Sequence, residues 1–263
     1  MSISLPSGEK GRPSGGDAGR PPGLHGPARR PLFSLGNRLA LCASLVRPGT
    51  RLADVGTDHA YLPIWLAGRG LIRSAVACDV RPGPLSRARR NIARYAVQDV
   101  VSARLSDGLD AVLPGEADDV VIAGMGGLMM ISILERAPWL RDGDRRLVLQ
   151  PMTAAPQLRE YLAREGYAVL AERAAAEDGH VYAAMQAAFC PEGCRCGELF
   201  PYIGRVTPEA PAGRDYLRLQ ARRLKKKAGG LAHCGRTGEA QRCGRLARKI
   251  ESLLRGEERR VLP

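Results

Sequence analysis

Strand and helix signals alternate along the chain from about residue 50 to residue 188. Short apolar stretches between helical patterns predict strands at residues 51–55, 74–80, 100–105, 119–123, 146–149, 167–170 and 180–188. Parallel strands need crossover connections of this kind, and helices then cover both faces of the sheet. The pattern predicts an α/β fold with a mostly parallel sheet that ends in an antiparallel hairpin around residues 177–179.

Composition divides the chain into four segments. Residues 1–31 are rich in Gly and Pro and poor in large apolar side chains, which predicts a disordered extension. The sheet domain takes residues 32–189, and a Pro-, Gly- and Cys-rich linker takes residues 190–213. In residues 214–263 leucines recur every seven residues, namely Leu217, Leu224 and Leu231, then Leu246 and Leu253. This spacing predicts a basic domain of two facing helices with a break at residues 229–238.

The net charge of +13 belongs to the two ends of the chain. Residues 1–31 carry +3, residues 214–260 carry +10, and the segment between them is neutral. A neutral body with cationic ends suggests a large polyanion as the partner, held through its phosphates. The alternative is that basic tails keep the protein soluble or reflect an arginine-rich genome, and charge alone leaves both open.

Apolar segments and cysteines bear on the compartment. No apolar run reaches the ~20 residues that cross a bilayer, and none follows the basic residues near the N-terminus. The seven cysteines are an odd number scattered along the chain, as expected of reduced thiols. We therefore expect a cytoplasmic protein without membrane contact. The sequence does not determine the oligomeric state, although a monomer is favoured.

One group of thiols and imidazoles lies in and after the linker and consists of Cys190, Cys194, Cys196, His233, Cys234 and Cys243. Such ligands could form a structural zinc site. The spacing C-x3-C-x-C is not that of a standard zinc knuckle, so we interpret the group as a chance cluster and predict no metal site.

Four loops leave the carboxyl ends of the predicted strands, where open α/β sheets bind their ligands. In the first loop Asp54 precedes Gly56, which lets the backbone approach a ligand closely. Asp79 ends the second strand and can accept hydrogen bonds from both hydroxyls of an adenosine ribose. Asp107 is placed to accept from an adenine amino group. The fourth loop opens a floor for a flat group with the residues Gly124, Met125 and Gly126.

The four loops together predict a site for a nucleoside-type ligand. No G-x-G-x-x-G follows a strand, which disfavours a dinucleotide-dependent oxidoreductase. Structural alternatives stay open for two acids. Asp54 could cap nearby backbone N–H groups, and Asp58 could be the N-cap of the following helix.

Two specific motifs are Asp58-His59-Ala60-Tyr61-Leu62-Pro63 and Gly124-Met125-Gly126-Gly127. With them, residues 35 to 188 closely resemble the bacterial tRNA (adenine(22)-N1)-methyltransferase family. The resemblance implies a Rossmann-like class I methyltransferase domain, a C-terminal helical, coiled-coil-like domain, S-adenosylmethionine as cofactor and tRNA as substrate. It implies methylation of N1 of adenine 22 in the D-arm. Thr57 and Asp79 stand where the family often has Ser and Glu.

The resemblance also suggests roles for the substrate-facing residues. Asp58 is the candidate for stabilising the cationic ring that forms on methylation, with His59 and Tyr61 as orienting or stacking neighbours. His59 could instead stabilise its loop, and Tyr61 could be a packing residue. Gln150 could bind an adenine edge. Arg38 could bind phosphate or the cofactor carboxylate, or form a surface ion pair.

Adenine N1 lies on the Watson–Crick edge, so the target base must be unpaired or flipped out. We expect one face of the C-terminal domain to hold the RNA backbone through the residues Arg218, Arg222, Arg223, Lys225, Lys226 and Lys227. Two other functions remain open. One is a methyltransferase for another RNA, a small molecule or a protein, and the other is a non-catalytic RNA-binding protein with a Rossmann-like shell.

Overall fold

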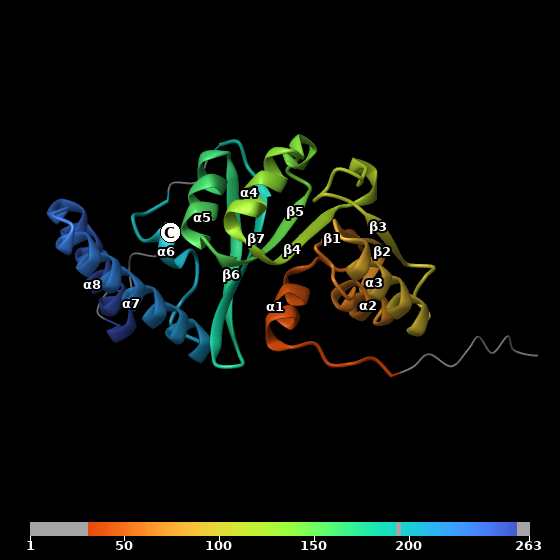
Figure 1. Ribbon diagram of the computed structural model, residues 1–263, viewed down its shortest axis with the longest axis horizontal. Helices are drawn as coiled ribbons and strands as arrows, with labels where there is room; N and C mark the ends of the chain where they lie inside the picture. Colours follow the sequence, from red (N-terminus) through yellow and green to blue (C-terminus); the bar gives the residue numbers. More distant parts are fainter. Residues whose placement is uncertain (1–30, 193–195, 257–263) are drawn as a thin grey trace, which may run out of the picture.

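The computed structural model describes residues 31–192 and 196–256. The predicted extension at residues 1–31 lies, apart from Pro31, outside the described residues. A seven-stranded sheet forms the centre of the molecule (Figure 1) in the order β3-β2-β1-β4-β5-β7-β6. The strands are β1 (Thr50–Val55), β2 (Ile72–Asp79), β3 (Val101–Leu105), β4 (Asp119–Gly126), β5 (Arg146–Thr153), β6 (Tyr167–Glu177) and β7 (His180–Phe189). The antiparallel strand is β7, which lies between β5 and β6.

Helices cover both faces of this sheet and continue beyond its β6 edge. They are α1 (Asn37–Leu45), α2 (Tyr61–Gly68), α3 (Pro82–Arg94), α4 (Gly127–Glu135), α5 (Ala155–Arg164), α6 (Phe200–Ile203), α7 (Pro211–His233) and α8 (Thr237–Arg255). Short 3-10 turns lie at Pro114–Glu116 and Pro138–Leu140. Within the part of the chain that the structure describes, none of these helices has the length and apolarity to span a bilayer.

The strand sequences explain why the sheet is covered twice. In β4, Val120 and Ile122 pack into the core formed with α4 and α5, while Val121 packs into the core formed with α1, α2 and α3. All three side chains are fully buried. Alternate residues of a strand point to opposite faces, so a continuous apolar run needs a helical layer on each side. The predicted α/β fold is confirmed.

Three strands run further than predicted. β4 continues past residue 123 to Gly126, so the predicted loop residues 124–126 belong to the strand. β6 continues past residue 170 to Glu177, and its pairing with β7 shifts register between Val169 and Ala171. β5 continues through Pro151 to Thr153 because Pro151 lies at an irregularity in the pairing with β4. Proline is tolerated at such places, where no ladder hydrogen bond is needed.

The C-terminal helices α7 and α8 form the predicted facing pair. The predicted break at residues 229–238 is wrong, because α7 continues through Gly229 and Gly230 and only residues 234–236 separate the helices. A helical glycine costs about 1 kcal/mol, which the packing of the pair outweighs. The predicted linker 190–213 also contains α6 and the start of α7, since Phe200 and Ile203 provide buried anchors.

A buried ion pair joins the sheet domain to α7. Arg159 of α5 and Glu172 of β6 have fully buried side chains, with Arg159 Nη2 2.6 Å from Glu172 Oε1. The same nitrogen donates to the hydroxyl of Tyr216 in α7 at 2.7 Å, and Nη1 donates to the carbonyl of Pro201. The backbone N–H of Arg205 donates to Glu172 Oε2. Four chain segments therefore meet at one guanidinium–carboxylate pair.

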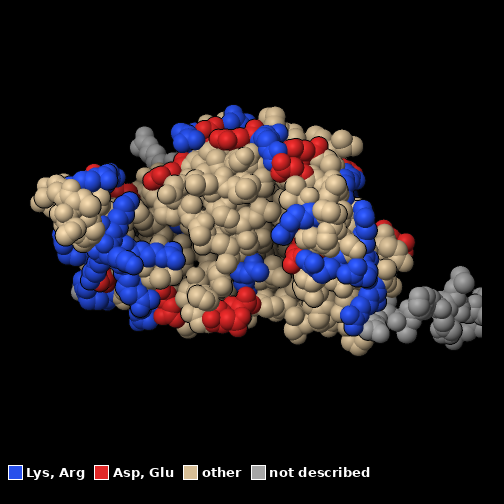
Figure 2. Space-filling model, in the orientation of Figure 1, with Lys and Arg blue, Asp and Glu red and all other residues tan. Residues whose placement is uncertain are grey.

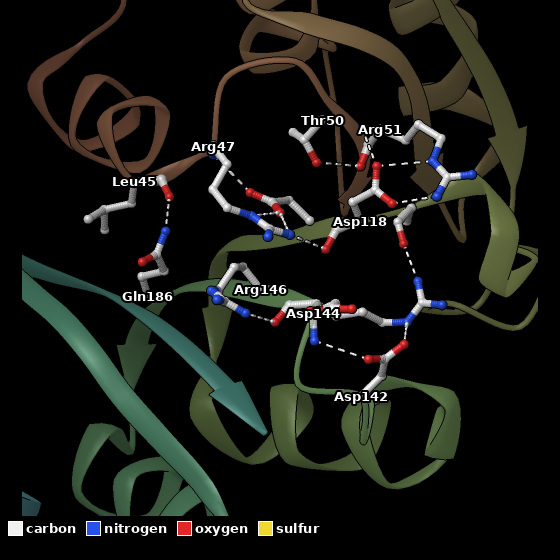
Figure 3. A network of polar contacts seen from close by, with 12 residues as sticks. Leu45, Arg47, Thr50, Arg51, Asp118, Asp142, Asp144, Arg146 and Gln186 are labelled. Atoms are coloured by element: carbon white, nitrogen blue, oxygen red, sulfur yellow. Dashed lines mark hydrogen bonds and ion pairs between the residues drawn. The ribbon is translucent and has the colours of Figure 1, made fainter. Parts of the chain in front are cut away.

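A second polar network links the segments at the amino-terminal ends of β1 and β4 (Figure 3). Asp119, fully buried at the start of β4, accepts from the backbone N–H and the guanidinium of Arg47. Its neighbour Asp118 accepts in the same way from Arg51 at the start of β1. Gln186 of β7 donates to the carbonyl of Leu45. These contacts therefore lie at the amino-terminal ends of the strands, and the predicted ligand loops lie at the opposite, carboxyl ends.

Candidate active site

The predicted cofactor loops meet at the carboxyl ends of β1 and β4. Gly56 has φ +77°, a conformation that L-residues avoid. A Cβ atom added there would lie 2.2 Å from the methyl group of Met125, so a larger residue would be strained and would displace the end of that side chain. The backbone N–H groups of Gly56 and Thr57 both donate to the carbonyl of Cys78 at the end of β2. The structure thus brings Gly56 and Met125, predicted from separate motifs, into contact.

Asp54 is a buried acid at the end of β1. Its side chain accepts a hydrogen bond of 2.5 Å from the hydroxyl of Thr57, and the described residues offer it no backbone N–H donor. Burial raises the pKa of Asp54 to about 6, the Thr57 hydroxyl opposes the shift, and the charge of Asp79 adds to it. Removal from water penalises the ionised form, and a cationic ligand group beside Asp54 would stabilise that form.

Asp79 is the second buried acid, 5% exposed at the end of the neighbouring strand β2. One oxygen accepts from the backbone N–H of Arg81 at 2.8 Å, which fixes the carboxylate. Two large apolar side chains are exposed beside Asp79: Val80, which is 59% exposed, and Leu105 at the end of β3, which is 54% exposed. Sequence reasoning missed these two, although an apolar residue directly after Asp79 was a usable signal.

Asp107 lies in a different environment from the other two acids. Its side chain is 61% exposed and forms an ion pair with Arg136 at 3.0 Å, and this hydrogen bond lowers the pKa of Asp107. Arg136 also pairs with Asp110. An adenine amino group that bonds to Asp107 would therefore displace the Arg136 guanidinium or share the carboxylate with it.

Gln150 connects two loops of the site. It is completely buried, and its Oε1 accepts from the backbone N–H of Gly124 at 3.1 Å and from Arg38 Nη1 at 2.9 Å. Gly124 has φ +80°, a conformation that favours glycine, and without a side chain its backbone can approach Gln150 closely. Arg38 also lies 3.8 Å from Glu177 and 6.0 Å from the ring centroid of Tyr182. These bonds hold the Gln150 side chain against Gly124 and Arg38, and its contact with an adenine edge stays a prediction.

The substrate-side residues Asp58, His59 and Tyr61 form one cluster. Asp58 forms an ion pair with Arg87 of α3, and this bond lowers the pKa of Asp58. His59 stacks on Tyr61 with ring centroids 5.1 Å apart and an interplanar angle of 8°, and Phe33 packs edge-on with Tyr61. The N-cap of α2 is Ala60, without a side-chain bond, so Asp58 does not cap this helix.

The described residues contain no group of three His, Cys, Asp or Glu side chains arranged to hold a metal ion. Of the cysteine cluster, Cys190 is a partly buried free thiol, and Cys196 packs against the hydrophobic core of the sheet domain. Cys194 lies outside the described residues.

Comparison with known proteins agrees with this geometry. A family described as "Methyltransferase domain" matches residues 35–185. The chain belongs to this methyltransferase family.

Individual relatives refine the comparison. A tRNA (adenine(22)-N(1))-methyltransferase of Bacillus subtilis is 37% identical over 155 residues, which cover 59% of this chain and 65% of that relative. The match thus spans just under two thirds of the relative's length. Among solved structures, a putative tRNA (m1A22) methyltransferase of Streptococcus pneumoniae has a TM-score of 0.74 at 28% identity, covering 82% of this chain and 99% of that one. The TrmK tRNA methyltransferase of B. subtilis has a TM-score of 0.71 at 28% identity, covering 85% and 98%. The resemblance drawn from the sequence motifs is confirmed.

The raised pKa of Asp54 gives this methyltransferase a testable pH dependence. A carboxyl whose folded-state pKa lies above its unfolded value stabilises the fold fully below the unfolded pKa and loses that contribution as pH rises through the folded one. From pH 4 to pH 7, cofactor-free Asp54→Asn should therefore gain stability relative to wild type, by up to about 3 kcal/mol. Urea denaturation at both pH values measures the difference. Parallel pH profiles for the two proteins would contradict it.

Proposed function

We propose that this chain transfers a methyl group from S-adenosylmethionine to N1 of an adenine in tRNA, at position 22 of the D-arm. The observation that carries the proposal is the pair of buried carboxylates, Asp54 and Asp79, beside the Gly56 loop at adjacent strand ends. The relatives named above support the substrate. The S. pneumoniae protein has also been solved with S-adenosyl-L-methionine, and a Mycoplasma capricolum TrmK with S-adenosyl-homocysteine.

The cofactor site is assigned from these positions. Asp79 would accept from the ribose hydroxyls, and Asp54 would face the amino group of the methionine part. Gly56, Gly124 and Gly126 would let the backbone approach, with Met125 against the ligand. The adenine ring would lie between Val80 and Leu105, and Asp107 would accept from its amino group while Arg136 shares the carboxylate.

The bound cofactor supplies an electrophilic methyl group on a positively charged sulfur. The N1–C bond forms as the C–S bond breaks, the electron pair of that bond stays on sulfur, and the positive charge moves to the adenine ring. Neutral adenine N1 carries no proton, so the site needs no general base. Its tasks are to align the two groups, exclude water and stabilise the new cation. Asp58 would provide that stabilisation, with His59 and Tyr61 beside the base.

Asp58→Asn tests this role. The substitution keeps the shape of the side chain and removes its charge, so kcat for methyl transfer should fall about 10- to 100-fold. Affinity for S-adenosylhomocysteine should stay within about twofold, because Asp58 stabilises the substrate ring. Single-turnover transfer and calorimetry measure the two quantities. Equal losses in both would show that the residue serves the loop instead.

We propose that residues 32–189 form the catalytic domain and that the helical pair α7–α8, starting at Pro211, binds the tRNA. Lys and Arg side chains gather over these helices (Figure 2). Both ligands would be bound by one chain, in keeping with a monomer. The helix cations would hold the backbone without reading sequence.

The test is methyl transfer from labelled S-adenosylmethionine to bulk bacterial tRNA, followed by mapping of the modified base. Labelled N1-methyladenine at position 22 is expected. Binding of S-adenosylhomocysteine without transfer to tRNA would indicate a methyltransferase with another substrate. No binding at millimolar ligand would indicate a non-catalytic shell.

A further inference from the structure

A cleft of about 940 Å³ lies between the sheet domain and α7. One wall is the end of β5 with the start of α5, the second is the tip of the β6–β7 hairpin, and the third is one face of α7. Its lining includes Met152, His180 and Tyr182 on the sheet side, and Arg218, Arg222 and Lys227 on the helix side. The roles assigned above use cations of its helix wall but give no role to its sheet wall.

The helix wall of the cleft is cationic. Of the six cations predicted to bind RNA, Arg218, Arg222, Arg223 and Lys227 line the cleft, whereas Lys225 forms an ion pair with Glu251 of α8 at 2.6 Å. Lys226 is exposed outside the lining. Two acids also reach the cleft: Glu160, and Asp215, which pairs with Arg218 at 3.0 Å. Among the described residues no ion pair joins Arg222 or Lys227 to an acid, so both are available to phosphate.

The opposite wall is aromatic and partly apolar. His180 is exposed and Tyr182 half-buried on β7, with ring centroids 6.2 Å apart. Met152, 45% exposed, lies near them at the end of β5. Exposed rings beside a row of cations are the combination that binds single-stranded nucleic acid, because bases stack on the rings while phosphates meet the charges.

The cleft is continuous with the cofactor edge. Pro151 and Thr153, which line it, are the partners of Met125 and Gly126 at the irregular end of the β4–β5 pairing. Arg38 joins the two regions, since it donates to Gln150 beneath Gly124 and lies over the Tyr182 ring. The helix wall is held in place where Tyr216 meets the buried Arg159.

We propose that this cleft holds the unpaired RNA segment next to the target adenine, with phosphates on Arg222 and Lys227 and a base stacked on Tyr182. The inference rests on the proposed function and adds the path of the strand. The target base would leave the cleft past Met152 and Thr153 and reach the cofactor loop.

The experiment measures binding of the full-length chain to bulk bacterial tRNA across a salt series. The variants are Arg222→Ala/Lys227→Ala, Tyr182→Ala and Tyr182→Phe. The control is Arg73→Ala, an exposed arginine near the start of β2, outside the cleft and outside α7 and α8. The double variant should lower the salt slope by about 0.7 for each phosphate that it no longer neutralises. Tyr182→Ala should weaken binding about 5- to 150-fold, while Tyr182→Phe keeps the ring and the affinity.

Two further readouts separate the inference from the proposed function. Affinity for S-adenosylhomocysteine and melting temperature should match wild type in the cleft variants, and Arg73→Ala should bind tRNA as wild type does. If wild type methylates tRNA but the cleft variants bind it as the control does, the cleft is overturned and the function stands. If wild type binds tRNA without methylating it and the cleft variants bind it more weakly, the proposed function is wrong and the role of the cleft in RNA binding is supported. Concentration-dependent dimers that the cleft variants abolish would assign the surface to a protein partner and overturn the inference.

Discussion

Replacing Arg159 with methionine should lower the free energy of unfolding by about 3 to 5 kcal/mol. Methionine fills much of the same volume but leaves the carboxylate of Glu172 buried without its charge partner. The hydroxyl of Tyr216 and the carbonyl of Pro201 lose their donor as well. Urea denaturation of the cofactor-free protein measures the loss.

The double variant Arg159→Met/Glu172→Leu identifies the cause. Removing both charges takes away the unpaired carboxylate, so the double variant should recover a large part of the stability lost by the single one. Equal losses in both would attribute the effect to packing around α6 and α7 rather than to the buried charge.

Asp79→Asn should weaken binding of S-adenosylhomocysteine by about 10- to 150-fold, because hydrogen bonds to a charged group contribute about 1.5 to 3 kcal/mol. The amide keeps one acceptor oxygen and places a donor where the second ribose hydroxyl would donate. Calorimetry on the full-length chain measures the affinity.

Asp79→Glu is the matched control. It retains the carboxylate, which the related family often carries on the longer side chain, so it should bind the ligand more tightly than the Asn variant. Wild-type affinity in Asp79→Asn would remove this residue from the cofactor site.

The sequence predicted the elements and the loops better than it predicted side-chain partners. Buried strands and the order of Asp54, Gly56 and Asp79 follow from local apolar runs and from residues directly after them, so they were readable. The sequence did not reveal that Gln150 bonds to Arg38 and Gly124, because these bonds join segments far apart in the chain.

The same limit applies to the C-terminal helices. Leucine spacing predicted the pair, but the glycines suggested a break that packing overrides. Six adjacent cations looked equivalent in the sequence. Only the placement of α7 beside the hairpin separates those in the cleft from Lys225, which is tied to Glu251.

The ion pairs at the amino-terminal edge of the sheet have a practical consequence for engineering. Asp118 and Asp119 secure the starts of the strands, while the residues assigned to the ligands lie at the opposite ends. Substitutions that raise thermal tolerance can therefore be concentrated around Arg47 and Arg51 without reshaping the catalytic loops. Effects of sites this far apart and without shared partners usually add, so stability and turnover can be optimised in separate rounds and then combined.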